Sequence, residues 1–589
     1  MKKVFNVLAI IFAISLLFMV YITFSIEKNI QFRHWLSDHF QKVEIESNAP
    51  AVYFLGVDQI YTDTAPFLVS SPKFINLEWL KEVDATYQYD ASEGVLSLIW
   101  NGHLLVVNAN GTVTLNGENR SEKIEIKGIK DEIYIAADAL NTLDGFDQIG
   151  IHITASEDQQ THVVTFDAIQ YQVKQVKNKS YIFESADKLK KSQLFKPYPT
   201  IGDIRKPLVV VDRIGPKDQI VSYDINSEIS IIYNGRTIGY GLRNQLTDSV
   251  DVNTYKYKTE DFYLDKQLIE GPIFLVWEAV YSKNPNTANI PKMNGVNVVS
   301  PTWIELKTAQ GDITEKISTD YLDWSKRNNL NTWILATNAF DPDLTHELLT
   351  SYSGKKRFIE QLVNLCLKYN IDGINLDFEN IYLADKAILS HFVNELAWQC
   401  NAFGIVLSMD VTVMNGSDNW SKCFDRRMLG KIVDYLVIMT YDEHWASSPI
   451  SGPVSSYDWV EDSMKKIIEI VPNRKVVMGL PFYTRIWTES LSNDEANKVN
   501  VSSEAISMIA QNALIEEKAL EPIWNEQEGL FYVSYIEENS IHKIWVENEV
   551  TLSKKASLAK KMALKGIACW RRGFEVPYVY DALLNEIQD

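Results

Sequence analysis

The chain has 589 residues, a formal net charge of −20, and 46% hydrophobic and 23% charged residues. This composition excludes a disordered scaffold, and the length predicts about two to four domains. The acidic balance argues against nucleic-acid binding, because that affinity depends on Lys and Arg side chains that neutralise phosphates. The four cysteines are scattered without C-x-x-C spacing, so we expect buried free thiols. No His/Cys cluster has metal-ligand spacing, and we expect neither a metal site nor a cofactor.

The N-terminus carries an apolar run over residues 7–26, directly after Lys2 and Lys3. Such a run is long enough to span a bilayer as a helix, and no A-x-A-like cleavage site follows it. We therefore predict a signal anchor over residues 1–26, with the rest of the chain outside the membrane. A cleaved signal peptide, which would give a secreted protein, is the alternative. Residues 27–49 are typical of a polar stalk.

Two small modules are expected next, over residues 50–170 and 171–250. The first has alternating strands with Asn-Gly turns at 101–102, 110–111 and 116–117, followed by a helix over 134–146. It resembles the N-terminal α/β module of copper amine oxidases but has no copper ligand set. The second has recurring short strands, which predict a small β-barrel, and it resembles a bacterial Src-homology-3-like module. It would act as a wall-binding module or as a spacer.

Residues 265–589 alternate short apolar runs with helical stretches, the pattern of a parallel sheet covered by helices on its faces. Eight such units predict an α/β fold of the (β/α)8 TIM-barrel type. Residues 522–548 predict extra antiparallel strands, and hence an α+β insertion between the seventh and eighth barrel strands. The eight expected strands lie in 273–280, 296–303, 331–338, 371–379, 404–411, 434–442, 475–482 and 566–570.

The fourth of these strands carries three polar residues at alternate positions, Asn375, Asp377 and Glu379. They share one face, which we expect to point into the barrel, with Glu379 at the carboxyl end where barrel enzymes keep their active sites. Burying unpaired carboxylates is costly, and the strands offer no inward cation for a salt bridge. Crowding by Asp377 would raise the pKa of Glu379 and leave it protonated as an acid. Two carboxylates on one strand suit glycoside hydrolysis in which the substrate's own acetamide is the nucleophile.

Four motifs carry a family resemblance. The sequence "DGINLDFE" resembles the D-G-x-x-x-D-x-E signature of family 18 glycoside hydrolases, the chitinase-like barrels, and "MTYD", "GLPFYTRIW" and "GIACW" resemble their sixth, seventh and eighth strands. The resemblance implies that Glu379 is the acid/base, Asp377 the acetamide partner and Tyr441 the group that stabilises an oxazolinium intermediate. Trp570 would form the floor of the sugar subsite. Asn375 stands where many chitinases have Asp, which should shift the pH profile.

Further substrate contacts are expected near the strand ends. Asp410 should lie level with the carboxylates, and Glu278 is either an inward polar partner or a solvated loop residue. Tryptophans just after strands are candidates because sugar rings stack on aromatic rings, although most tryptophans are expected in the core. The remaining candidates are Met439, Asp442, Tyr483, Trp303, Trp445 and Trp487.

The forms "GINLDFEN" and "MTYDEHW" are similar to the spore and cell-wall branch of the family, the cortex-lytic N-acetylglucosaminidases. We therefore expect a membrane-held enzyme that hydrolyses β-1,4 bonds of N-acetylglucosamine polymers with retention. Peptidoglycan is the first expected substrate, and chitin oligomers are the second. The alternatives are a non-catalytic sugar-binding barrel and a structural envelope protein.

Overall fold

The computed structural model describes residues 268–491 and 499–588, most of 85–143, and separate short segments between 51 and 266. The chain forms two compact units, and each is discontinuous in sequence. The first contains residues 1–83 and 127–258, and the second contains 84–126 and 259–589. Residues 50–170, expected as one module, are thereby divided between the two units.

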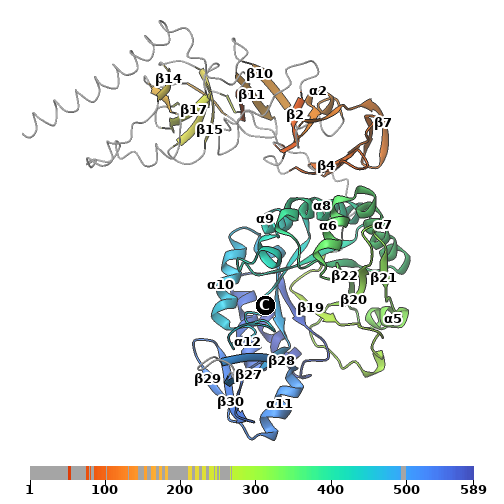
Figure 1. Cartoon of the computed structure of the whole chain (residues 1–589), viewed down its shortest axis with the longest axis vertical. Coiled ribbons are helices and arrows are strands. Elements are labelled where there is room, and N and C mark those ends of the chain that lie inside the picture. Colours follow the sequence, from red (N-terminus) through yellow and green to blue (C-terminus); the bar gives the residue numbers. More distant parts are fainter. Residues whose placement is uncertain are drawn as a thin grey trace, which may run out of the picture. The chain divides into compact units, whose positions relative to one another are not determined.

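The first unit is mainly β-structure (Figure 1). A seven-stranded sheet has the order β14-β13-β17-β16-β15-β12-β18, within the region expected to be rich in short strands. The helix expected over 134–146 is shorter, because residues 134–136 belong to strand β9 and pair with β2. The described elements are β1 (Ala51–Phe54), β2 (Phe74–Asn76), β8 (Ile126–Ile129), β9 (Glu132–Ala136), α2 (Ala137–Leu140), β10 (Ile151–Ala155), β11 (Thr161–Phe166), β12 (Gln172–Gln175), β13 (Ser180–Phe183), β14 (Val210–Ile214), β15 (Gln219–Asp224), β16 (Ile229–Tyr233), β17 (Ile238–Leu242) and β18 (Asp251–Val252).

The second unit contains a closed barrel of eight parallel strands, which confirms the predicted fold. The first strand pairs with both the second and the eighth, and this pairing closes the sheet. A short strand, β21 (Ile313–Glu315), extends the second barrel strand in antiparallel pairing. The barrel strands are β19 (Ile273–Glu278), β20 (Val298–Leu306), β22 (Asn331–Thr337), β23 (Gly373–Asp377), β24 (Val406–Thr412), β25 (Tyr435–Met439), β26 (Val476–Pro481) and β32 (Gly566–Trp570).

Helices surround the barrel and bury its outer face. The outward side chains of the strands join the helices in one large apolar core, while Trp277, Trp333 and Tyr435 belong to a second cluster inside the barrel. Local signals set the helix ends: Asp341 caps the N-terminus of α6, and Asn370 ends α7 in a left-handed conformation. The helices are α5 (Thr319–Arg327), α6 (Pro342–Thr350), α7 (Tyr352–Tyr369), α8 (Lys386–Ala402), α9 (Arg426–Ile432), α10 (Tyr457–Ile468), α12 (Glu549–Lys561) and α13 (Val579–Ile587).

The predicted α+β insertion lies between the seventh and eighth barrel strands. It is a five-stranded antiparallel sheet with the order β28-β27-β31-β30-β29 and one helix, α11 (Met508–Glu517). One face of this sheet forms a small apolar core with α11. Its strands are β27 (Tyr483–Leu491), β28 (Val499–Ser507), β29 (Ile523–Asn525), β30 (Leu530–Glu537) and β31 (Ser540–Val546).

A five-stranded meander over residues 84–126 belongs to the same unit as the barrel. Its strands pair in chain order, and the turns that contain Gly102, Gly111 and Gly117 join the last four strands, as the Asn-Gly pairs predict. Asn116 takes a positive φ of 53° at the third turn, a conformation that Asn tolerates well. The strands are β3 (Thr86–Asp90), β4 (Val95–Trp100), β5 (His103–Val107), β6 (Thr112–Leu115) and β7 (Glu118–Lys123).

The meander packs on helices α7 and α8 through buried polar contacts. The Ser97 hydroxyl donates to Glu395 Oε1 at 2.5 Å, and Glu395 also pairs with the fully buried Lys355 at 2.6 Å. The Trp398 indole N–H donates to the carbonyl of Gly102 at 3.0 Å. Because burying these charges without partners would be costly, the contacts make the meander an integral part of the second unit.

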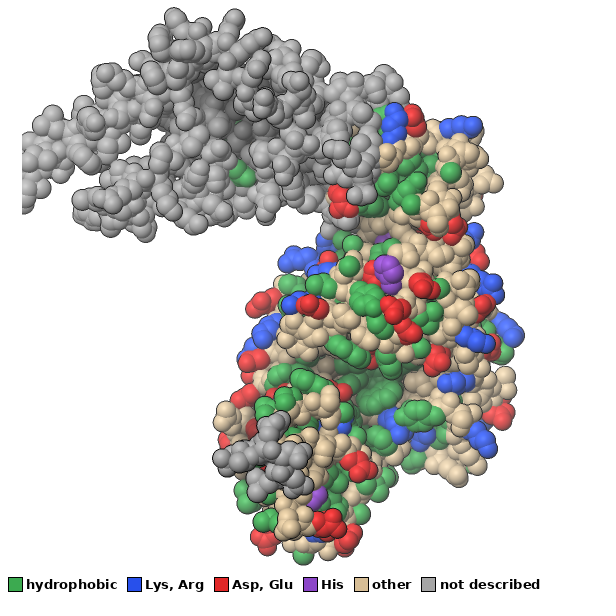
Figure 2. Space-filling view, viewed as in Figure 1, with side chains coloured by type: hydrophobic (Ala, Val, Ile, Leu, Met, Phe, Trp, Pro, Cys, Tyr) green, Lys and Arg blue, Asp and Glu red, His purple; other side chains and the backbone are tan. Residues whose placement is uncertain are grey.

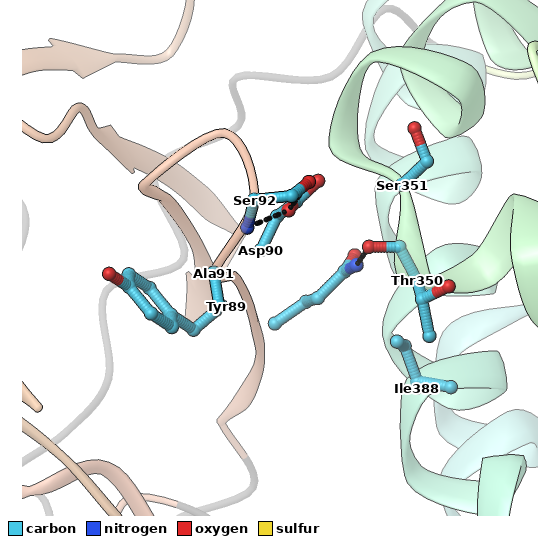
Figure 3. A pocket seen from close by; sticks show the side chains of 8 residues that line it. Tyr89, Asp90, Ala91, Ser92, Thr350, Ser351 and Ile388 are labelled. Atoms are coloured by element: carbon cyan, nitrogen blue, oxygen red, sulfur yellow. Dashed lines mark hydrogen bonds between the residues drawn. The ribbon is translucent and has the colours of Figure 1, made fainter. Parts of the chain in front are cut away.

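A hollow marks the edge of this contact, where the turn after β3 faces the end of α6 (Figure 3). Asp90 accepts hydrogen bonds from the Ser92 backbone and hydroxyl, and also from the backbone N–H of Tyr352 at 2.8 Å. The Gln88 amide donates to the carbonyl of Thr350 at 2.9 Å. These bonds fix the turn against the helices.

The four cysteines are buried free thiols, as expected. No helix in the described part of the chain is long and apolar enough to cross a membrane. The anchor expected over residues 1–26 and the stalk over 27–49 lie outside the described residues.

Candidate active site

Strand β23 carries the central polar residues on the barrel's inner face, as the alternation predicts. Asn375 is fully buried, and Asp377 is only 8% exposed. The strand ends at Asp377, so Glu379 lies two residues beyond it, half-buried at the carboxyl end of the barrel. The alternating apolar residues Ile374, Leu376 and Phe378 all lie in the outer core. The two carboxylates therefore lie at the end where a barrel holds its chemistry.

Asn375 is fixed by three hydrogen bonds from three other strands. Its carbonyl oxygen accepts from the Trp277 indole at 2.8 Å and from the Ser300 hydroxyl at 2.9 Å. Its amide group donates to Asp410 Oδ1 at 2.7 Å. Asp410 is 1% exposed, so the sequence-based placement of Asp410 beside the acid cluster agrees with the structure.

The carboxylates of this cluster have raised pKa values. Burial raises the pKa of Asp377 to about 7 from its ordinary value of 3.8. Burial, followed by the charges of Asp377, Asp410 and Asp442, raises the pKa of Glu379 well above its usual range. Burial, and next the charge of Asp377, also raises the pKa of Asp410. Glu379 consequently keeps its proton to a higher pH than an ordinary glutamic acid does and can serve as an acid.

One oxygen of the cluster has no partner within the described residues. Asp377 Oδ1 is buried and accepts no hydrogen bond. A buried acceptor without a donor is unusual, since most such atoms are paired. The oxygen is therefore available to a donor group on a bound ligand.

Asn338 holds the backbone of Glu379. The Asn338 side-chain oxygen accepts from the Glu379 N–H at 3.1 Å, and its amide donates to the Glu379 carbonyl at 2.7 Å. The same amide donates to the Thr345 hydroxyl at 2.8 Å, and Asn338 is fully buried. Two bonds to the backbone of one residue, one on each side of its Cα, fix the position from which the acid extends.

The residues after β25 form a second group beside the acid. Tyr441 packs edge-on against Tyr483, with ring centroids 6.3 Å apart. The Tyr483 hydroxyl donates to Asp442 Oδ1 at 2.7 Å, and Arg485 lies 3.8 Å from the same oxygen. Burial raises the pKa of the Tyr441 phenol, so Tyr441 stays protonated and remains a hydrogen-bond donor.

Aromatic side chains line the inside of the barrel next to these polar groups. Trp570, at the end of the eighth strand, packs edge-on against Trp277 at 6.0 Å, and both belong to the interior cluster. Met439 lies at the end of β25 and is 7% exposed. Trp445 is 53% exposed in the loop that follows Asp442, so its ring is open to a ligand.

Three sequence-based candidates are not placed for substrate contact. Trp303 is fully buried in the outer core against Tyr321, and Trp487 is 1% exposed. Glu278 is neither an inward residue nor a solvated one: it is 3% exposed and binds Arg572 through two hydrogen bonds. Glu278 follows the inward Trp277 on β19, so it points to the outer face of the barrel.

One face of the second unit is hollowed beside the insertion, and mainly hydrophobic side chains form the floor of the hollow (Figure 2). No cluster of His, Cys, Asp or Glu among the described residues has the arrangement to hold a metal ion.

Comparison with known families decides the class of the barrel. Residues 308–575 match the family description "Glycosyl hydrolases family 18". The chain carries a family 18 glycosyl hydrolase domain. It is a glycosidase, and the motifs predicted to mark this family lie in or next to the barrel strands.

Related proteins match part of the chain. The uncharacterized glycosylase YvbX of Bacillus subtilis is 29% identical over 285 residues, which cover 46% of this chain and 80% of YvbX. The cortical fragment-lytic enzyme of Bacillus anthracis is 27% identical over 250 residues, 42% of this chain and 56% of that enzyme. A crystal structure of a chitinase from Chromobacterium violaceum has a TM-score of 0.49 at 24% identity, covering 54% of this chain and 100% of that one.

Several residues of the glycosidase site were not identified from the sequence. Trp277 and Ser300 bind Asn375, Asn338 holds Glu379, and Arg485 lies beside Asp442. Ser300 is a polar residue within an apolar strand, which could have indicated an inward position, whereas β19 is apolar on both faces and gives no such signal for Trp277. Asn338 carries no such signal, because it follows the end of β22 and its partner is 41 residues away.

Proposed function

We propose that this glycosidase hydrolyses β-1,4 bonds of N-acetylglucosamine-containing glycans with retention, and that the substrate's acetamide is the nucleophile. The observation that carries the proposal is the pair at the end of β23. Glu379 has a strongly raised pKa, and the neighbouring Asp377 has a buried oxygen without a donor. An acid and an unpaired acceptor side by side match the needs of this reaction.

In the first step, Glu379 donates its proton to the glycosidic oxygen as the bond from C1 breaks. The acetamide carbonyl oxygen attacks C1 and forms a cyclic oxazolinium ion. Asp377 accepts the acetamide N–H, and its negative charge stabilises the positive charge that develops on the ring. The Tyr441 hydroxyl donates a hydrogen bond to the acetamide oxygen and holds that oxygen in line with C1. In the second step, the Glu379 carboxylate takes a proton from water, and the oxygen of that water bonds to C1 and opens the ring.

Peptidoglycan is the proposed polymer. Support comes from the relatives named cortical fragment-lytic enzymes and from the resemblance of the N-terminal modules to bacterial envelope modules. Chitin oligomers are the second candidate, supported by a relative named as a probable di-N-acetylchitobiase that is 24% identical over 271 residues. We further propose that residues 1–26 hold the enzyme on the outer side of the membrane.

The activity is tested with a chain that begins at about residue 45, because this variant retains the meander together with the barrel. Purified peptidoglycan and chito-oligosaccharides would be digested, and new reducing ends would be identified by mass spectrometry, with Glu379→Gln as the control. We expect N-acetylglucosamine reducing ends that the control does not release, and the faster polymer identifies the substrate. Binding without products from either polymer would instead favour a non-catalytic sugar-binding barrel.

Membrane attachment has a separate test in cells. The full chain should fractionate with membranes and be cleaved by added protease in intact wall-less cells, and a chain lacking residues 1–26 should do neither. Recovery of the processed full chain from the medium would support the cleaved-signal alternative.

A further inference from the structure

A second hollow lies on the insertion sheet, outside the catalytic cluster. It has a volume of about 610 Å³ and is bordered by β29, β30 and β31. Three aromatic side chains line it, Trp524, Tyr532 and Trp545, together with the exposed Ile523. None of its lining residues belongs to the catalytic group. Its rim includes Ser451, in the segment that follows Asp442 and Trp445.

The aromatic rings are fixed by neighbours. The Trp545 indole N–H donates to Glu528 at 2.7 Å, and its ring packs edge-on against Tyr532 at 5.1 Å. The Trp524 indole N–H donates to Glu526 at 2.5 Å. All three rings are half-buried, so part of each ring surface remains open to the hollow. Fixed rings lose little conformational entropy when a ligand packs on them.

The charges around the hollow are compensated within the protein. Lys543 pairs with Glu489 at 2.8 Å, and Glu526 lies 3.6 Å from Lys554. Glu528 accepts from the Asn525 amide at 2.8 Å as well as from Trp545. A charged ligand would have to compete with these internal pairs, whereas an uncharged ligand with hydroxyl and amide groups would not.

We propose that this hollow is an accessory site for an uncharged N-acetylglucosamine unit of the β-linked glycan. A pyranose ring presents an apolar face of C–H groups, which packs on aromatic rings, and a polar edge, which suits carboxylate and amide acceptors. The hollow offers both surfaces. The choice of ligand rests on the proposed glycosidase function, and the site would hold the polymer while the barrel acts on it.

The test uses the Glu379→Gln chain from about residue 45 and a soluble N-acetylglucosamine oligosaccharide, measured by titration calorimetry. We expect two classes of binding site. Trp545→Ala should weaken one class at least tenfold and leave the other, whereas Trp545→Phe, which keeps a ring, should retain most of the binding. Ile536→Ala is the matched control, because Ile536 lies on β30 outside the hollow and is 79% exposed.

A second measurement distinguishes loss of the accessory site from misfolding of the variant. With Glu379 intact, Trp524→Ala should leave kcat/KM on a short soluble substrate within twofold and slow release from the insoluble polymer at least threefold. A single binding class that Trp545→Ala does not change would overturn the proposal, as would equal losses on short and polymeric substrates. If binding depends on Trp545 but no polymer is cleaved, the accessory site stands and the proposed catalytic function fails.

Discussion

Replacing Asp377 by Asn should stabilise the protein while abolishing its activity, and the gain should depend on pH. The pKa of Asp377 is about 7 in the folded chain against an ordinary 3.8. Below pH 3.8 both states hold the proton, so the carboxylate costs no stability. Between these values the unfolded chain releases the proton and the folded chain keeps it, so the free energy of unfolding falls as pH rises. Above about pH 7 the loss is complete and is on the order of 4 kcal/mol.

Asn removes this titration and keeps the shape of the side chain. The free energy of unfolding of Asp377→Asn should exceed that of the parent by almost nothing at pH 4 and by a few kcal/mol at pH 8. Urea unfolding at several pH values measures this difference. The matched control is Asp462→Asn, at a side chain that is 70% exposed. The difference in free energy of unfolding between this variant and the parent should not change with pH. A variant that is equally stable at pH 5 and pH 8, or less stable at pH 8, would refute the argument that burial of the carboxylate is uncompensated.

Glu379→Gln should lower turnover by roughly a hundredfold to ten-thousandfold, as loss of a general acid does, without lowering the unfolding midpoint; a smaller kinetic effect would point to another acid. Asn338→Ala removes two bonds to the Glu379 backbone, and we expect kcat to fall more than tenfold while KM changes little. An unchanged kcat would show that Glu379 needs no such support. Asn375→Asp places a carboxyl beside Asp410 and should move the alkaline limb of the pH–rate profile to higher pH, because added negative charge raises the pKa of the acid; an unmoved profile would contradict this. Ser97→Val should destabilise the unit by about 1–3 kcal/mol, because it leaves the buried Glu395 with one fewer donor, and chemical denaturation would measure the loss.

The periodicity of the sequence was enough to locate the barrel and its central residues. Continuous apolar runs mark strands that are buried on both faces, and each of the eight runs overlaps a barrel strand. Within β23 the polar residues stand out against that apolar background, so the inward direction of Asn375 and Asp377 could be deduced from alternation alone. The Asn-Gly pairs located the turns of the meander for a similarly local reason.

The errors arose where packing rather than local pattern decides. Strand β20 continues to Leu306, so Trp303 lies within the strand and not at its end, and its ring is buried in the outer core. On β19 both faces are apolar, so the outward direction of Glu278 was not visible, and its partner Arg572 is 294 residues away. Similarly, no local pattern links Ser97 to Glu395, which is 298 residues distant.

The split of the catalytic unit has a consequence for how the chain is made. Residues 84–126 leave the ribosome first, yet the helices they pack against begin only at Tyr352. The face of the meander that packs on these helices therefore stays exposed until α8 has been synthesised. Residues 127–258 belong to the first unit and interrupt the second unit in the sequence. Starting the chain near residue 265 would leave the buried Lys355 and Glu395 facing water.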